Sequence, residues 1–105
     1  MKLLTTIKGT NLNKGRARTW LETNQKNIEQ YVFTRGTRIN IYFYSDHITI
    51  EVQPDGPRKV AGRVKNDNTI CVFDICYPTD QRQQMFNGAD RLNVFISQGA
   101  IRITA

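Results

Sequence analysis

The chain has 105 residues, of which 39% are hydrophobic and 23% are charged. This composition is typical of one compact domain with a small core, and it excludes a disordered chain and a pair of independent domains. The formal net charge is +6, and no apolar run approaches the ~20 residues that a membrane-spanning helix needs.

The positive charge is concentrated in the first part of the chain. Residues 1–45 hold eight Lys and Arg and two acidic residues, whereas residues 46–105 hold seven of each. A second local group lies in residues 58–65, where four of the eight side chains are cationic. Such an imbalance favours polyanionic partners, which means nucleic acid or an acidic protein surface; the plain alternative is that the charge keeps a small protein in solution.

The amino terminus lacks the pattern of an export signal. A signal peptide has an apolar core of about 7–15 residues, and the apolar segment here is broken before Lys8. We therefore expect a cytoplasmic protein without a membrane partner, in which Cys71 and Cys76 remain thiols.

In chain order, the first predicted strand covers residues 16–22, and a short polar helix over 25–32 follows it. Residues 38–44 and 48–52 then alternate apolar and polar side chains on either side of a short turn. This alternation predicts a β-hairpin whose apolar residues face a core.

The second part of the chain repeats this order after a Pro- and Gly-rich connector. The predicted elements are the connector at 53–57, a strand at 58–64, a strand at 69–75, a helix between Pro78 and Gly88, and a hairpin at 91–96 and 101–103. The second helix has Met85 and Phe86 as its apolar anchor.

A shift of 53 residues aligns the two parts of the chain. It places residues 30–50 over 83–103 with six identities, which are Gln30, Phe33, Arg38, Asn40, Ile48 and Ile50. We therefore predict one domain over 1–105, with repeats at about 16–52 and 69–104 joined by 53–68. Each repeat has too few apolar side chains to bury a hairpin alone, so the two are expected to close into a small barrel or sandwich with an internal two-fold pseudo-symmetry.

The sequence indicates neither an enzyme nor a metal or cofactor site. Its one histidine, His47, lies at a predicted hairpin turn, so no imidazole-based catalytic set is available. Cys71 and Cys76 are five residues apart and have no further ligands for zinc, and Cys71 is expected to be buried. For Asp74, a pairing with an arginine or with backbone donors is favoured over a catalytic role.

The basic residues are the better functional candidates. Four surround the Gly-containing segment 8–15, two stand at the entrance of the first hairpin, and three belong to the group at 58–65. The candidate nucleic-acid-binding residues are Lys8, Lys14, Arg16, Arg18, Arg35, Arg38, Arg58, Lys59 and Arg63. Each is alternatively a solvated charge or the partner of an acidic residue.

Tyr42 and Tyr44 share the predicted outer face of the first hairpin with Arg38. Interleaved aromatic and basic side chains can stack on single-stranded nucleic acid. The favoured interpretation is that both tyrosines are ordinary cross-strand partners in a sheet.

The duplicated order of strand, short helix and hairpin resembles the AbrB-like swapped-hairpin fold, which includes SymE-like proteins. Residues 33–38 (FTRGTR) look like the turn into the family's hairpin, and 86–91 (FNGADR) is a looser version. The family usually forms homodimers, so the resemblance implies a mainly β, internally duplicated barrel with two short helices, a pseudo-dimer in one chain. It also implies Arg16, Arg18, Arg35 and Arg38 as the first candidates for contacts with DNA.

A closer resemblance is to a domain found at the front of some phage and bacterial DNA cytosine methyltransferases. The stretches that carry it are 16–22 (RARTWLE), 58–63 (RKVAGR), 73–75 (FDI) and 90–94 (DRLNV), and together they span about residues 16–104. No methyltransferase domain is present, so the resemblance implies an accessory part.

The leading hypothesis is a small basic protein that binds double-stranded DNA, as a transcription regulator or as a targeting module of DNA-modifying machinery. One alternative is a phage-type anti-defence inhibitor that binds an acidic or nucleic-acid-handling protein. Another, suggested by the resemblance alone, is a SymE-like toxin acting on RNA. A homodimer through an open sheet edge remains compatible with each hypothesis.

Overall fold

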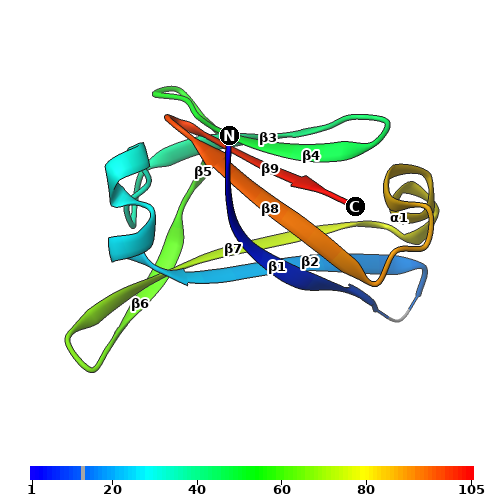
Figure 1. The fold of residues 1–105 in the computed structure, drawn as a ribbon, viewed down its shortest axis with the longest axis horizontal. Helices are drawn as coiled ribbons and strands as arrows, with labels where there is room; N and C mark the ends of the chain where they lie inside the picture. The colour runs from blue at the N-terminus through cyan, green and yellow to red at the C-terminus, as the bar shows by residue number, and fades with distance from the viewer. Residues whose placement is uncertain (13) are drawn as a thin grey trace.

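The computed structural model describes residues 1–12 and 14–105, and this part of the chain is mainly β (Figure 1). Its nine strands form one antiparallel sheet in the spatial order β5-β3-β4-β9-β8-β1-β2-β7-β6. The elements are β1 (Lys2–Asn11), β2 (Arg16–Asn24), the 3-10 turns η1 (Gln25–Asn27) and η2 (Glu29–Tyr31), β3 (Arg38–Phe43), β4 (His47–Val52), β5 (Arg58–Lys59), β6 (Ala61–Lys65), β7 (Asn68–Pro78), the helix α1 (Thr79–Phe86), β8 (Arg91–Ser97) and β9 (Ala100–Thr104).

One short segment joins the two ends of the sheet. The predicted strand at 58–64 is two strands, of which β5 pairs with β3 and β6 pairs with β7. Val60 lies between them and is buried. Its N–H donates to the Thr37 carbonyl and its carbonyl accepts from the Gly36 N–H, each at 2.9 Å. The sheet therefore curls into a nearly closed antiparallel barrel.

The core fills the inside of this barrel. Figure 1 shows β1, β2 and β7 on one side and the hairpins β3–β4 and β8–β9 on the other. Both sides contribute alternate inward-facing residues, as a half-buried sheet requires. The buried apolar side chains include Ala17, Leu21, Cys71, Phe73 and Ile75 from the first side and Ile39, Ile48, Ile50, Leu92, Val94, Ile96, Ile101 and Ile103 from the second.

Both predicted hairpins are confirmed. Ile41 lies opposite Ile50 in the β3–β4 hairpin, and Val94 lies opposite Ile103 in the β8–β9 hairpin. Phe43 differs from the expectation, because this predicted core residue is 40% exposed at the end of β3 and packs on the Tyr77 ring at a centroid distance of 5.8 Å.

The predicted helix at 25–32 is wrong, because this segment forms η1 and η2. The side chain of Asn24 does accept a hydrogen bond from the Lys26 N–H at 3.0 Å, as a helix cap would. However, Ile28 has a φ of −127° and donates to the Gln25 carbonyl three residues earlier. So short a segment cannot sustain an α-helix on its own, and the burial of Ile28 in the core sets the break.

The second predicted helix is confirmed as α1, and it buries Met85 and Phe86. Asn87, at φ 49°, ends it in the left-handed conformation, and Gly88 follows at φ 75°. No helix in the described residues is long and apolar enough to cross a membrane.

β1 was not predicted. Residues 8–15 were expected to form a loop, whereas the strand continues to Asn11 and the turn begins after it. β1 pairs with β8 and with β2, so long-range pairing on both sides stabilises a segment whose own alternation is weak.

The connector between the two parts of the chain offers a test of this packing. A Cβ at Gly56 would lie 2.3 Å from the carbonyl oxygen of Ile39, which is a backbone atom that cannot move aside. We expect Gly56→Ala to lower the free energy of unfolding by about 1–3 kcal/mol in urea titrations. The control is Asp55→Ala at the exposed neighbouring position, and equal stability of the two variants would contradict the close approach.

Candidate nucleic-acid interface

The outer face of β2 carries the most informative side chains. Its burial alternates, so that Ala17, Thr19 and Leu21 are buried while the residues between them face outward. Trp20 is among the outward residues and is 38% exposed. In the sheet it lies opposite Asp74 of β7. An exposed indole thus lies at the middle of a sheet face.

Arginines from three different strands are joined to this indole. Arg18 contacts the ring itself. Arg63 pairs with Glu22, the hydrogen-bond partner of the indole. Arg58 bonds the backbone of the residue opposite Trp20. We define the Trp20 cluster as Trp20 with these arginines and two carboxylates: Arg18, Glu22, Arg58, Arg63 and Asp74. The Cζ atom of Arg18 is 5.4 Å from the centre of the Trp20 ring, within the range of a cation–π contact. Folding therefore brings together residues that are up to 45 positions apart (Arg18 and Arg63).

Two carboxylates and one backbone carbonyl hold the arginines in place. Arg18 Nε lies 3.0 Å from Asp74 Oδ1, and Arg58 Nη2 donates to the backbone carbonyl of Asp74 at 3.1 Å. Arg63 pairs with Glu22, which also accepts a hydrogen bond from Trp20 Nε1 at 3.2 Å. Such exposed ion pairs contribute little to stability, so phosphate oxygens can compete for these arginines. The expected pairing of Asp74 with an arginine is confirmed.

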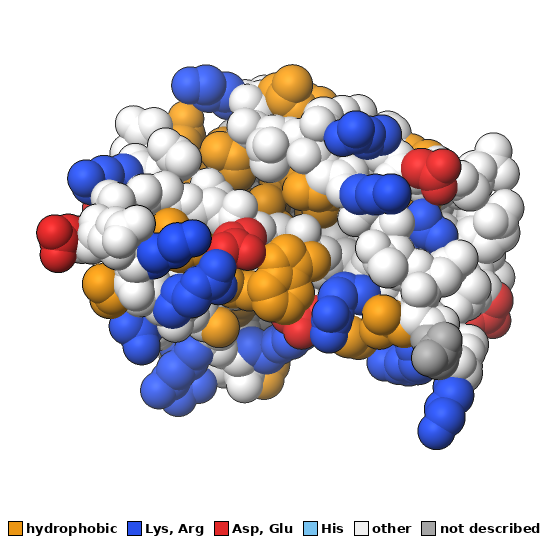
Figure 2. Space-filling view, turned by 90° about the horizontal axis from the view of Figure 1, so that it is seen from below, with side chains coloured by type: hydrophobic (Ala, Val, Ile, Leu, Met, Phe, Trp, Pro, Cys, Tyr) orange, Lys and Arg blue, Asp and Glu red, His pale blue; other side chains and the backbone are white. Residues whose placement is uncertain are grey.

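Further cations extend this face toward both ends. Lys14 and Arg16 lie at the end where β1 turns into β2, and Lys65 lies at the end where β6 turns into β7. These two ends are at opposite sides of the molecule along its longest dimension, which is 36 Å (Figure 1). Figure 2 shows Lys and Arg side chains along the length of this face, with fewer carboxylates between them.

Lys8 continues the same face on the next strand. It is exposed in β1 and lies opposite Arg91 of β8, which is also exposed. Opposed residues of neighbouring strands place their side chains on the same face of the sheet. Arg91 thus adds a second cation beside Lys8.

The remaining predicted site residues lie elsewhere. The side chain of Arg35 covers the inner side of Gly62, where a Cβ would meet its Cδ atom at 3.4 Å, so it is on the opposite face of β6 from Arg63. Arg38 donates to the Gly56 carbonyl at 3.0 Å and pairs in register with Lys59. The structure thus places five of the nine candidates on one face, namely Lys8, Lys14, Arg16, Arg18 and Arg63. Arg58 reaches the edge of this face, where it bonds the Asp74 carbonyl. Arg35, Arg38 and Lys59 lie away from it.

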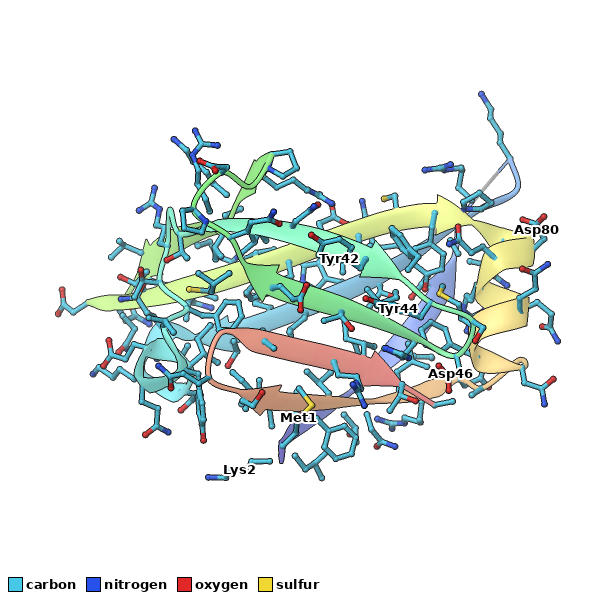
Figure 3. The ribbon with its side chains drawn as sticks, turned by 90° about the horizontal axis from the view of Figure 1, so that it is seen from above. Met1, Lys2, Tyr42, Tyr44, Asp46 and Asp80 are labelled. Atoms are coloured by element: carbon cyan, nitrogen blue, oxygen red, sulfur yellow. The ribbon has the colours of Figure 1, made fainter. Side chains whose placement is uncertain are left out.

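The aromatic residues considered for stacking also lie apart from Trp20. Tyr42 and Tyr44 belong to the hairpin side, seen in Figure 3 from the direction opposite to Figure 2. Tyr42 donates to Gln53 at 3.0 Å, and the ring of Tyr44 stacks on His47 at 4.5 Å. Both have protein partners, in line with a structural role.

Sequence reasoning named Lys65 only within the basic group at 58–65, and it did not place Trp20, Glu22 or Arg91 on a common face with the basic candidates. The alternation of polar and buried residues in 16–22 could have placed Trp20 beside Arg18 on one side of a strand. The approach of Arg58 and Arg63 to that strand depends on the closure of the barrel, and nothing local in the sequence predicts it.

Three titratable groups outside this face have shifted pKa values. The hydrogen bond from His47 lowers the pKa of Asp46, with a distance of 2.6 Å between Nδ1 and Oδ1. Burial raises the pKa of the Cys71 thiol and also that of Tyr77, whose hydroxyl is 2.6 Å from the Thr19 hydroxyl. Within the described residues, no group of three His, Cys, Asp or Glu lies close enough to hold a metal ion.

A scan against protein-family models, a search of curated proteins and a search of solved structures found no match to this chain. No functional residue can therefore be assigned by comparison with a relative, and the candidate interface is argued from the geometry of this chain alone.

The two thiols should differ in reactivity. Cys76 is exposed, whereas Cys71 is buried and has a raised pKa. Because the thiolate is the reactive form, we expect a thiol-reactive dye to modify one cysteine of the native protein rapidly and the second only on unfolding. Cys76→Ser should remove the rapid phase. Rapid labelling of that variant would show that Cys71 is accessible.

Proposed function

We propose that this is a small DNA-binding protein that lays the outer face of β1, β2, β7 and β6 along the phosphate backbone of double-stranded DNA. The observation that carries the proposal is the Trp20 cluster, in which Arg18 contacts one exposed indole and the arginines of β5 and β6 are joined to it through Asp74 and Glu22. A transcription regulator and a targeting module of DNA-modifying machinery both need such a surface.

The dimensions of this face support binding to duplex DNA. Its cationic ends lie along a molecular dimension of 36 Å, and one turn of B-DNA advances about 34 Å. The two ends can therefore meet the same groove edge on successive turns, with the Trp20 cluster between them. Most contacts would be to phosphates, which position the protein, and an arginine that reaches a base edge would add specificity.

We further propose that the chain is an internally duplicated, AbrB-like swapped-hairpin barrel. The pairs Ile41–Ile50 and Val94–Ile103 are related by 53 residues in both members, in agreement with the repeat in the sequence. The strand that precedes each repeat also pairs with the hairpin of the other repeat, because β1, before the first repeat, pairs with β8, and β5, in the connector before the second, pairs with β3. This exchange is what a swapped pseudo-dimer requires.

Removing one arginine of the cluster tests the DNA-binding proposal. We expect Arg63→Ala to weaken binding of a 30-base-pair duplex about tenfold at low salt, measured by fluorescence anisotropy. If about five phosphates are contacted, a plot of log binding constant against log salt concentration has a slope of roughly −4.5 for the unchanged protein. The slope for the variant should be shallower by about 0.9.

Arg102→Ala is the matched control, because Arg102 is an exposed arginine of β9, outside the four strands of the proposed face. We expect it to change the affinity by less than about twofold. Equal losses in both variants would contradict a defined interface. Absence of duplex binding at low salt would remove the proposal and leave the protein-binding inhibitor as the better hypothesis.

Glu22 should oppose DNA binding, because its carboxylate occupies Arg63 and repels phosphate. We expect Glu22→Gln to raise the affinity for duplex DNA about three- to tenfold. Glu29→Gln changes the net charge equally at an exposed residue of η2 and should have a smaller effect. A loss of affinity in Glu22→Gln would mean that Glu22 positions Arg63 and Trp20 for binding.

A further inference from the structure

Two strand edges face each other in the barrel without pairing. β5 pairs with β3 only at Arg38 and Ile39, and β6 pairs with β7 only from Asn68 to Val72. Beyond β5, residues 40–43 of β3 have no neighbouring strand among the described residues on the edge that β5 occupies. Beyond β6, residues 73–78 of β7 likewise have none on the edge that β6 occupies, in the part of the chain that the structure describes. We call the space between these two edges the seam.

Side chains fill the seam instead of a strand. The rings of Phe43 and Tyr77 pack across it at a centroid distance of 5.8 Å. Beside them lies a cavity of about 90 Å³ with apolar walls from both edges, including Ile39, Ile41 and Phe73. Arg58, Lys59 and Asp74 complete its lining. The seam is thus an apolar slot with a charged rim.

On each edge, one backbone group that faces the seam forms a hydrogen bond with a side chain, and the backbone of an added strand can take the place of that side chain. The N–H of Ile41 donates to Oδ1 of the adjacent Asn40 at 2.9 Å. On the facing edge, the Asp74 carbonyl accepts from Arg58 Nη2 at 3.1 Å. Neither bond belongs to the barrel's ladder, so an entering strand can take both groups without breaking strand pairing.

The charge at the seam specifies the occupant. Arg58 and Lys59 line it, and Arg38 lies opposite Lys59 in the register. Asp74 is the one acidic residue in this lining, and Arg18 already pairs with it. An acidic chain therefore gains attraction here, whereas a basic chain is repelled.

We propose that the seam binds an extended, acidic segment of a partner protein by strand addition. Its backbone would bond the Ile41 and Asp74 edges, its alternate apolar side chains would enter the slot, and its carboxylates would contact Arg58 and Lys59. This proposal does not rest on the proposed DNA-binding function, although the seam shares Arg58 and Asp74 with the Trp20 cluster.

A synthetic nine-residue peptide of alternating Glu and Val tests this site. Titrated into the ¹⁵N-labelled full chain, it should slow hydrogen exchange of the backbone amides of Ile41, Phe43 and Asp74. A peptide of the same composition with Glu and Val in separate blocks should bind at least fivefold more weakly, because it cannot present one apolar face.

Charge reversal provides the matched pair of variants. Lys59→Glu, at the seam, should weaken binding of the alternating peptide about fivefold. Lys65→Glu, at an exposed position outside the cavity lining, should change the affinity for this peptide less than about twofold. Equal affinity for both peptides, or equal effects of both variants, would show attraction by net charge alone and overturn the proposal. Self-association through the seam, seen by sedimentation, would also overturn it by making a second copy the occupant.

Discussion

The whole structure depends on how the segment 58–65 closes the sheet. Val60 is buried, and its two backbone hydrogen bonds to Gly36 and Thr37 fix the point at which the chain leaves β3 and joins β7. Without this crossing, β3 and β7 would be open edges at opposite ends of a seven-stranded sheet. Closure gives both sides of the barrel a shared apolar interior, which is the main source of stability in so small a domain.

The same closure builds the basic face. Arg58 and Arg63 stand on either side of Val60, and the crossing brings Arg58 to the backbone carbonyl of Asp74 and Arg63 to the carboxylate of Glu22. The Trp20 cluster is therefore a product of the topology. The seam has the same origin, because the crossing segment is too short to cover the full length of both edges.

Local pattern was sufficient for the hairpins and for α1, where alternation, Pro78, Asn87 and Gly88 agree with the tertiary structure. It failed where long-range contacts decide. β1 exists because β8 and β2 pair with it, and the helix expected at 25–32 breaks where the core takes up Ile28. The sequence pointed to arginine as the main residue type of the candidate site, but the separation of Arg35 and Arg38 from Arg18 followed only from the path of the chain.

The central claim is that the two parts of the chain complete each other, since β1 borders the second hairpin and β5 borders the first. Complementation of the fragments 1–55 and 56–105 tests it most directly. The account predicts that neither fragment alone shows a cooperative thermal transition, and that mixing them yields a folded one-to-one complex in circular dichroism and sedimentation. A cooperative, monomeric fold of either fragment by itself would contradict it.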